Sequence, residues 1–492
     1  MKEYLAFDLG ASSGKIIRGS FEGEILTLSQ EHVFPNQIIQ LGEGLYWDFL
    51  NIFDQMRTGL QKAAARKPFD SFGVDSFNND FSFISPGGGL LQPVRSYRDP
   101  RTRRHEEAIY QKISRRDLYR LTGNQLAPFN TFMQLAAMRE DGEDAWLDRG
   151  ARLLFLPDLM GYYLTGEQYT EYSVAAETQM LDWDSRDWIE ELLKLLDIRR
   201  ETFAPIVMPG SIAGQASASF LKQNGLPTFR HVAVCEHDTA SAFLAAPAGA
   251  DTATLSCGTW TILGAENDRP VITDFGFRHN IANEGSLKGH HRICYNVMGL
   301  WILQQLKADM ASQGQLFTYG EIQESAIASA PFQAIINPDD PVFYPPGRME
   351  QTLRENTLEG KRRMKDAEPG LLFRMVYESL ALQYRWALSK LETLLARKLG
   401  AVSLIGGGAR DKVLCQFTAN ALNLPVIAGP VEASSAGNIL VQMLADSAIA
   451  SICQGRDIIR KSFDLTTYLP RDVPAWNEQY QRFLTLAHPE EE

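Results

Sequence analysis

A β-hairpin pattern that occurs twice constrains the fold of this chain more than any other feature. In the first copy, residues 4–17, an apolar strand is followed by the small polar loop DLGASSGK and a second strand. The second copy, residues 252–264 (TATLSCGTWTILG), has the same order, and similar segments follow each copy. This repetition predicts a duplicated domain with one Gly/Ser/Thr loop in each half. Two unrelated hairpins are the alternative.

The loop of the first hairpin is a candidate phosphate-binding element. It is not a Walker P-loop, because its spacing is one residue short, Ile16 replaces the Ser/Thr, and a strand follows instead of a helix. Backbone N–H groups and hydroxyls at a hairpin tip can nevertheless bind an anion, and Lys15 adds positive charge. Asp8 could hold Mg²⁺ through its carboxylate, since hard cations prefer oxygen ligands. An ordinary hairpin with an exposed lysine is the alternative.

The stretch 230–246, RHVAVCEHDTASAFLAA, carries the candidate catalytic residue. An apolar strand at 231–235 is followed by a small-residue helix from Thr239, and Glu236, His237 and Asp238 stand between them. Ligands of open α/β sheets bind at such strand ends. Asp238 is therefore either a helix N-cap or a catalytic base beside a cleft.

Two further strand–loop patterns suggest ligand contacts. Residues 72–84 read as a strand that breaks into polar residues, among them Asp75 and Asn78, and then resumes. Because apolar residues flank them, these polar groups need partners from the loop or from a polyol ligand. Residues 402–422 read as a strand, the glycines 406–408 and a helix, an arrangement that lets a flat ligand approach the backbone. Asp411 stands where GxGxxG needs its third glycine, which excludes a Rossmann motif.

The remaining helices are predicted from apolar spacing and from capping residues. They are expected after Asp48 up to about residue 67, over 103–120 as a charged outer face, over 153–165 and 188–196, from near Asn296 to 304, and over 370–398, 412–422 and 436–445.

Composition excludes several classes of protein. A chain of 492 residues suggests roughly two to four domains. The net charge of −12 argues against nucleic acid or an anionic membrane as the main partner. The five scattered cysteines form no CxxC pair, and Cys235 and Cys257 are expected to be buried thiols. Without a predicted signal peptide or membrane span, a cytoplasmic location is expected, with disorder only at the acidic end, 489–492.

Nine motifs in sequence order identify a family resemblance. They are DLGASSGK, YRDPRT, PFNT, HDTASA, SCGTW, IANEG, NVMGLW, IGGGARD and AGPVEASSAGN. The chain resembles the FGGY family of carbohydrate kinases nearly end to end. The resemblance implies an α/β fold with two duplicated actin-like, ribonuclease-H-like ATPase domains and a cleft between them. Residues 1–246 would form the sugar-side domain, 247–470 the adenosine-side domain and 471–492 a C-terminal tail.

The same resemblance implies a role for each candidate residue. Asp238 looks like the base that takes a proton from the sugar, and Asp8 like the carboxylate near Mg²⁺. Mg-ATP and the sugar would bind between two domains that close on each other. The implied phosphate contacts are Ala11, Ser12, Ser13, Gly14, Lys15, Gly258 and Thr259, the adenosine contacts are Gln304, Gly407 and Gly408, and the sugar contacts are Asn78, His237, Asp238, Thr239 and Asn296.

The implied activity is ATP-dependent phosphorylation of the primary hydroxyl of a ketose. L-Rhamnulose is the leading candidate, in L-rhamnose catabolism, and L-fuculose or another deoxyketose is the alternative. Three departures bear on the sugar and the nucleotide: Phe77-Asn78 replaces a common Trp-Gly pair, Asp411 a common Asn, and Lys15 a common Arg.

Small molecules are the expected partners, with no nucleic acid or membrane and a monomeric or homodimeric state. A non-catalytic actin-like ATP module and a degenerate kinase that only binds its ligands are the rivals. The presence of Asp238 beside a polar sugar loop favours the enzyme.

Overall fold

The computed structural model describes residues 1–148, 150–247, 249, 251–360 and 364–489. The chain forms two compact α/β units that do not follow chain order. Unit 1 comprises Met1–Ala245, Glu266–Ile293 and Ala433–Ser462, and unit 2 comprises Ala246–Ala265, Cys294–Glu432 and Phe463–Glu492. Of the acidic end predicted to be disordered, residues 490–492 lie outside the described residues.

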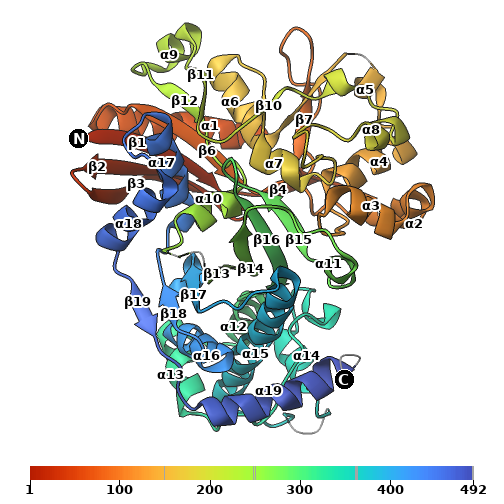
Figure 1. Cartoon of the computed structure of the whole chain (residues 1–492), viewed down its shortest axis with the longest axis vertical. Helices are drawn as coiled ribbons and strands as arrows, with labels where there is room; N and C mark the ends of the chain where they lie inside the picture. Colours follow the sequence, from red (N-terminus) through yellow and green to blue (C-terminus); the bar gives the residue numbers. More distant parts are fainter. Residues whose placement is uncertain (149, 248, 250, 361–363, 490–492) are drawn as a thin grey trace. The chain divides into compact units, whose positions relative to one another are not determined.

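Unit 1 is built on a six-stranded sheet with the order β11-β12-β6-β1-β2-β3 (Figure 1). The first two strands form the predicted hairpin and β3 extends it to an antiparallel meander, while β6 and β12 continue the sheet parallel to β1. The strands are β1 Lys2–Leu9, β2 Ser13–Glu22, β3 Ile25–Pro35, β6 Ser71–Ser76, β11 Ser211–Gln215 and β12 Arg230–Ala233.

The second large sheet, β15-β16-β14-β13-β17-β18-β19, repeats this plan. Its hairpin β13–β14 is antiparallel, and β17 and β18 continue the sheet parallel to β13. The sequence prediction of a duplicated domain is therefore confirmed. The strands are β13 Thr252–Cys257, β14 Trp260–Asn267, β15 Ala282–Gly285, β16 His291–Met298, β17 Ala401–Ile405, β18 Val426–Ala428 and β19 Thr466–Tyr468.

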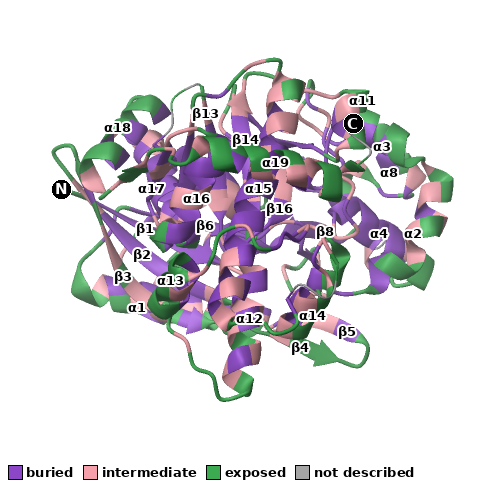
Figure 2. Ribbon diagram, turned by 90° about the horizontal axis from the view of Figure 1, so that it is seen from below, coloured by how far each residue is buried: buried purple, intermediate pink, exposed green. Residues whose placement is uncertain are grey.

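Helices α1 (Phe49–Arg66) and α17 (Ala433–Ala445) pack on the sheet of unit 1. Their contacts on β2 lie on opposite faces: Ile16 meets α1 at Gly59, and Gly19 meets α17 at Ile439. Strands β1 and β6 are accordingly buried almost along their whole length (Figure 2). Covered on both faces, they read as continuous apolar runs.

Helix α17 also crosses α10 (Asp238–Leu244) at very short range. A Cβ built on Gly437 would lie 1.7 Å from the carbonyl oxygen of Ser241. Only glycine allows the two helices to approach this closely. The contact with α17 therefore holds the position of α10, the helix that begins with Asp238.

Two helix predictions are corrected. The helix expected over 153–165 begins later, because β8 (Arg152–Phe155) precedes α6 (Leu156–Thr165). The helix expected to begin near Asn296 is wrong, because Asn296 lies on β16 and α12 (Trp301–Ser312) starts only after Gly299. Both errors have one cause: a short apolar run is compatible with either a strand or a helix.

Other predictions hold. The charged stretch 103–120 is helical, but it is two helices where one was predicted: α2 (Arg101–Lys112) ends before Ser114, which caps α3 (Arg115–Thr122). The long helix is α15 (Pro369–Leu395), followed by α16 (Lys412–Leu422). Cys235 and Cys257 are buried free thiols. The remaining elements of unit 1 are β4 Ile38–Leu41, β5 Gly44–Trp47, β7 Phe81–Ile84, β9 Thr170–Glu171, β10 Ile206–Val207, α4 Thr131–Asp141, α5 Ala145–Asp148, α7 Tyr172–Glu177, α8 Glu190–Leu195, α9 Ala218–Asn224, α11 Asp274–Arg278 and α18 Ile452–Ser462. Those of unit 2 are α13 Tyr319–Ala328, α14 Met349–Glu355 and α19 Val473–Ala487.

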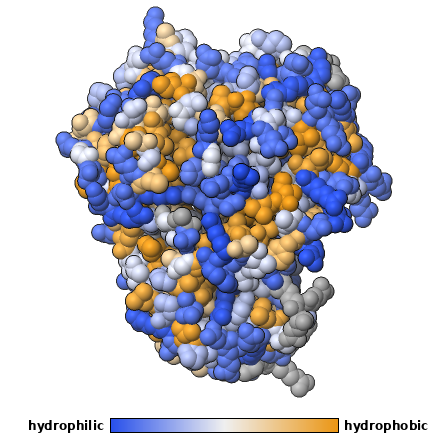
Figure 3. Space-filling model, in the orientation of Figure 1, coloured by the Kyte–Doolittle hydropathy of each residue, from blue (hydrophilic) through white to orange (hydrophobic). Residues whose placement is uncertain are grey.

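Among the described residues, no helix is both long and apolar enough to cross a membrane. The face seen in Figure 3 mixes hydrophilic residues with smaller apolar areas.

Candidate active site

The loop between β1 and β2 is a rigid hairpin tip. The Gly10 N–H donates to the Ser13 carbonyl (2.9 Å), and the Asn36 side chain donates to the Gly10 carbonyl (2.9 Å). Gly14 is required because a Cβ there would lie 2.3 Å from the Phe34 ring. Ser12, at the tip, is exposed. The predicted phosphate loop, residues 11–15, thus has a fixed backbone and an open tip.

Asp8 lies opposite Lys15 across this hairpin. The Lys15 ammonium is 3.4 Å from Asp8 Oδ2, and the Ser435 hydroxyl donates to the same oxygen at 3.0 Å. A second carboxylate, Asp75, is the register neighbour of Asp8 on β6 and accepts from Asn438 at 2.6 Å. Burial, and then the charge of Asp8, raise the pKa of Asp75. Ser435 and Asn438 belong to the motif AGPVEASSAGN, but nothing in the sequence paired them with Asp8 and Asp75.

Asp238 is the first residue of α10, and His237 holds the N-cap position, so the N-cap prediction for Asp238 is wrong in position. Asp238 Oδ1 accepts from the Thr239 N–H (2.5 Å) and the Thr239 hydroxyl (3.1 Å). Burial raises the pKa of Asp238, the charge of Asp8 adds to this rise, and His237 and Thr239 oppose it. Its side chain keeps 28% exposure, so a ligand can reach the carboxylate.

His237 lies next to two other predicted site residues, Asp238 and Asn78. Its Nε2 lies 3.5 Å from Asp238 Oδ1 and 3.4 Å from the Asn78 amide nitrogen. Burial, together with the charge of Arg292, lowers the pKa of His237 to about 4, so the ring is neutral near pH 7. Asn78, His237, Asp238 and Thr239 therefore form one group in unit 1.

The polar loop after β6 divides into ligand-accessible and structural residues. Asp80 accepts from the Trp47 indole (2.6 Å) and the Tyr97 N–H (3.0 Å). Asn79 adopts a left-handed conformation and accepts from the Thr131 N–H at 3.0 Å. Protein partners thus satisfy Asn79 and Asp80. Asn78, half-buried, is the residue of this loop that faces His237.

A buried charged cluster that the sequence did not reveal lies behind His237. Ligand atoms of Glu177, His237 and Glu284 lie within 4.8 Å of one another, an arrangement that could hold a cation. Arg292 supplies that cation, since its Nη2 is 2.9 Å from Glu284 and 3.3 Å from Glu177. We therefore assign no metal to the cluster. Burial raises the pKa of Glu177 to about 7, and the charge of Arg292 opposes the rise.

In unit 2 the second hairpin loop packs on the start of α12. The Leu300 N–H donates to the Gly258 carbonyl (2.9 Å) and the Trp301 N–H to the Thr259 carbonyl (3.1 Å). The Thr259 hydroxyl donates to the Gln304 side chain at 3.2 Å. These three predicted nucleotide contacts, Gly258, Thr259 and Gln304, are thus neighbours.

The triple glycine has two distinct roles. A Cβ on Gly408 would lie 2.6 Å from Cys257 Sγ, so Gly408 is needed for packing against the second hairpin. A Cβ on Gly407 would meet no atom within 4 Å, so this position faces open space. Asp411 caps α16 and accepts from the Tyr377 hydroxyl at 2.5 Å. Asn296 lies in unit 2, whereas the other predicted sugar contacts lie in unit 1.

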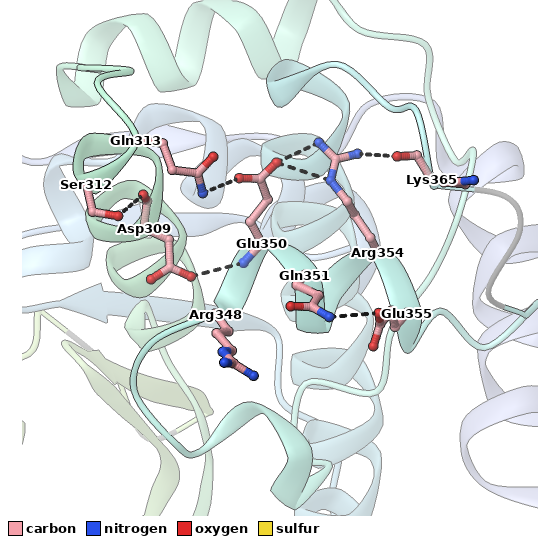
Figure 4. Close-up of a pocket in the computed structure, with 9 residues that line it drawn as sticks. All are labelled: Asp309, Ser312, Gln313, Arg348, Glu350, Gln351, Arg354, Glu355 and Lys365. Atoms are coloured by element: carbon pink, nitrogen blue, oxygen red, sulfur yellow. Dashed lines mark hydrogen bonds and ion pairs between the residues drawn. The ribbon is translucent and has the colours of Figure 1, made fainter.

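A cavity of about 680 Å³ in unit 2 is separate from these residues (Figure 4). It lies beside α12 and α14, and Arg354 pairs with Glu350 in it at 2.8 Å. The lining residues are Asp309, Ser312, Gln313, Arg348, Glu350, Gln351, Arg354, Glu355 and Lys365, none of which was predicted as a site residue.

Two family models cover most of the chain. The N-terminal domain of the FGGY family of carbohydrate kinases matches residues 3–245, and the C-terminal domain of that family matches residues 253–445. The chain belongs to the FGGY family of carbohydrate kinases. It is an ATP-dependent sugar kinase, because members of this family use ATP as a substrate.

Relatives and solved structures agree with this assignment. The chain is 37% identical over 484 residues to the rhamnulokinase of Bacteroides thetaiotaomicron, covering 98% of this chain and 99% of the relative. It is 33% identical over 489 residues to the rhamnulokinase of Lactiplantibacillus plantarum, covering 99% of each. The ligand-bound xylulose kinase from Lactobacillus acidophilus has the same fold, with a TM-score of 0.83, 16% identity and coverage of 99% and 97% of the two chains.

Proposed function

We propose that the protein transfers the γ-phosphoryl group of ATP to the primary hydroxyl of L-rhamnulose, giving L-rhamnulose 1-phosphate in L-rhamnose catabolism. The choice of sugar is supported by full-length similarity to relatives named rhamnulokinase. The observation that carries the reaction is the Asp238 carboxylate, partly exposed at the start of α10 with His237 and Asn78 beside it.

In this proposal Asp238 accepts the proton of the primary hydroxyl as its oxygen attacks the γ-phosphorus. Phosphoryl transfer depends mainly on positioning and on charge stabilisation, so the surrounding contacts matter as much as the base. Thr239 keeps the carboxylate folded against the helix start through two hydrogen bonds. Asn78, His237, Thr239 and Asn296 bind the hydroxyl and carbonyl groups of the ketose.

The nucleotide contacts are divided between the two repeated hairpins. Lys15 and the N–H groups and hydroxyls of residues 11–14 bind phosphate oxygens, as do Gly258 and Thr259. Gly407 leaves space at the backbone for the adenosine, next to the packing glycine Gly408, and Gln304 contacts the adenosine as well.

We assign Mg²⁺ to Asp8. Its carboxylate is the kind of oxygen ligand that Mg²⁺ prefers, and Asp75 beside it adds negative charge. Lys15 and Ser435 already contact Asp8 Oδ2, which favours binding through water. The ion would neutralise charge on the ATP phosphates. Asp8→Asn is expected to raise the Mg²⁺ concentration needed for half-maximal nucleotide binding.

The protein is further proposed to act in the cytoplasm on small molecules alone, as a monomer or homodimer, without a nucleic-acid or membrane partner. Its net charge of −12 disfavours polyanions. L-Fuculose is the second candidate substrate, because Asn78 adds an amide side chain at a proposed sugar-contacting position where related chains commonly have glycine.

A coupled assay of ADP release tests the proposal. Mg-ATP is supplied with L-rhamnulose, L-fuculose, L-xylulose, D-xylulose, D-ribulose or glycerol. We expect the highest kcat/KM with L-rhamnulose. A clear preference for another ketose would contradict the assigned sugar while leaving the kinase intact.

A further inference from the structure

We propose that Arg292 is a positioning residue for phosphoryl transfer: it holds the His237 ring in the tautomer that carries its proton on Nε2, the nitrogen 3.5 Å from Asp238 Oδ1. This inference rests on the proposed role of Asp238 as the base. Arg292 lies on β16 within unit 1, and nothing in its sequence context suggested a link to the strand–helix turn at 235–239.

The guanidinium of Arg292 is held in place from several sides. The side chain is fully buried, and its Nε donates to the Gly285 carbonyl at 3.2 Å. Its Nη2 lies 2.9 Å from Glu284 and 3.3 Å from Glu177, and the group stands over the Phe243 ring at 5.3 Å. A planar guanidinium in such a setting cannot turn away from its neighbours without losing them.

This fixed group determines the proton position on His237. Arg292 Nη2 is 3.2 Å from His237 Nδ1. Because a guanidinium only donates hydrogen bonds, Nδ1 must act as the acceptor. A neutral imidazole carries one proton, which then resides on Nε2.

Two neighbours favour the opposite tautomer. The Asn78 amide nitrogen, a hydrogen-bond donor, lies 3.4 Å from His237 Nε2 and would donate to an unprotonated Nε2. This neutral amide is the weaker of the two donors that face the ring, because the charged Arg292 lies nearer, at 3.2 Å from Nδ1. Glu177 Oε1 lies 3.4 Å from His237 Nδ1 and could accept a proton from it. Arg292 is nearer to Nδ1 and pairs with the same carboxylate oxygen, so it competes with the ring for Glu177. An N–H on Nδ1 would also face a donor of Arg292 at 3.2 Å, which is repulsive.

The backbone around His237 is held independently. The His237 N–H donates to the Ser173 hydroxyl (3.2 Å), and the Glu236 N–H donates to Glu171 (3.1 Å). The backbone at His237 is therefore held by contacts that do not involve Arg292, while ring protonation is set by Arg292. With its proton on Nε2, His237 directs an N–H dipole toward Asp238 Oδ1, 3.5 Å away.

The consequence for the reaction is charge stabilisation at the base. In the step, the hydroxyl proton moves to the Asp238 carboxylate, the sugar oxygen forms the bond to the γ-phosphorus, and ADP leaves with the electrons of the broken P–O bond. His237 keeps its proton throughout. Its N–H helps keep Asp238 ionised before the step and orients the carboxylate toward the substrate.

The tautomer can be read in the unmodified full-length protein. Histidine-selective ¹⁵N labelling with long-range ¹H–¹⁵N correlation distinguishes Nε2–H from Nδ1–H, and His237→Gln identifies the signal. We expect the Nε2–H pattern at neutral pH. An Nδ1–H pattern would overturn the proposal, whatever happens to any variant.

Kinetics of Arg292→Gln and Arg292→Lys complete the test. We expect kcat of Arg292→Gln to fall by about 10- to 100-fold, which is less than the loss of the general base itself would cost, with KM for Mg-ATP changed less than about twofold. Arg292→Lys, which can still donate to Nδ1, should recover part of the loss. Wild-type kcat in Arg292→Gln would contradict the proposal.

Arg18→Lys is the matched control for disturbing a buried ion pair. Arg18 contacts Glu3 (3.1 Å) and Glu31 (2.7 Å) in the same unit. For Arg18→Lys we expect lower thermal stability with unchanged kcat and an unchanged His237 spectrum. An equal loss of kcat in Arg18→Lys would mean that the kcat loss of Arg292→Gln only reflects lower stability, which would contradict the proposal. Full activity of Asp238→Asn would instead refute the base, leaving the tautomer reading intact.

Discussion

Asp238→Asn is the substitution that isolates the catalytic charge. The amide oxygen of asparagine can still accept from the N–H and hydroxyl of Thr239, now at 2.5 and 3.1 Å, so the start of α10 keeps its hydrogen bonds. What the variant loses is the negative charge and the ability to take a proton. A general base typically contributes about 10²- to 10⁴-fold, or roughly 2.7 to 5.5 kcal/mol of activation free energy.

Stability should not fall with this change. Burial raises the pKa of Asp238, which means that the folded protein disfavours its charged form. Replacing the carboxylate by a neutral amide is therefore expected to leave the melting temperature equal or higher. A variant with lost activity, retained ATP binding and retained stability has lost chemistry alone.

The assay is coupled ADP release at saturating sugar, with ATP affinity and thermal melting measured on the same preparations. Turnover within about tenfold of the wild type would refute the base assignment.

The pH profile gives an independent reading of the same group. The active form of Asp238 is deprotonated, so kcat/KM falls as the pH drops through its pKa. Because that pKa is raised, the acidic fall should lie above the pH at which an ordinary aspartate titrates. His237, with a pKa of about 4, is neutral near pH 7. Asp238→Asn should lack this acidic fall in kcat/KM. An unchanged fall in the residual activity of the variant would assign the titration to another group.

Three further predictions concern the sugar, the nucleotide and the fold. Asn78→Gly should change KM for the ketose by about tenfold and KM for ATP little; equal changes in both would remove Asn78 from the sugar contacts. Gly408→Ala should lower stability by about 1–3 kcal/mol through overpacking, whereas Gly407→Ala should spare stability and weaken ATP binding, as melting and titration calorimetry would show. Asp411→Ala should lower the free energy of unfolding by denaturant by about 2–4 kcal/mol, because it removes a helix cap and leaves the Tyr377 hydroxyl without its acceptor. Asp411→Asn should cost less, and equal losses in the two variants would contradict the cap.

The fold was predictable because its signals are local. The two hairpins, their small polar loops and the strand–helix turn at His237 and Asp238 each occupy a short stretch of sequence, and their order matched a known family. The misplaced helix at Asn296 shows the limit, since an apolar run of that length fits a strand equally well.

The surroundings of the site were not predictable, because they join distant segments. Ser435 contacts Asp8 across 427 residues, and Arg292 contacts Glu177 across 115 residues. Neither pair has a spacing that local periodicity can detect. The roles of the site residues remain predictions, although Asn78 and His237, named from separate motifs, lie side by side.

The position of the phosphate on the product tests the central claim most directly. After reaction of L-rhamnulose with Mg-ATP, ¹H–³¹P correlation spectroscopy identifies the protons coupled to the new phosphate ester. Transfer to the primary hydroxyl predicts coupling to the two methylene protons of C1. Coupling to a methine proton, or inorganic phosphate as the sole product besides ADP, would contradict the proposed reaction.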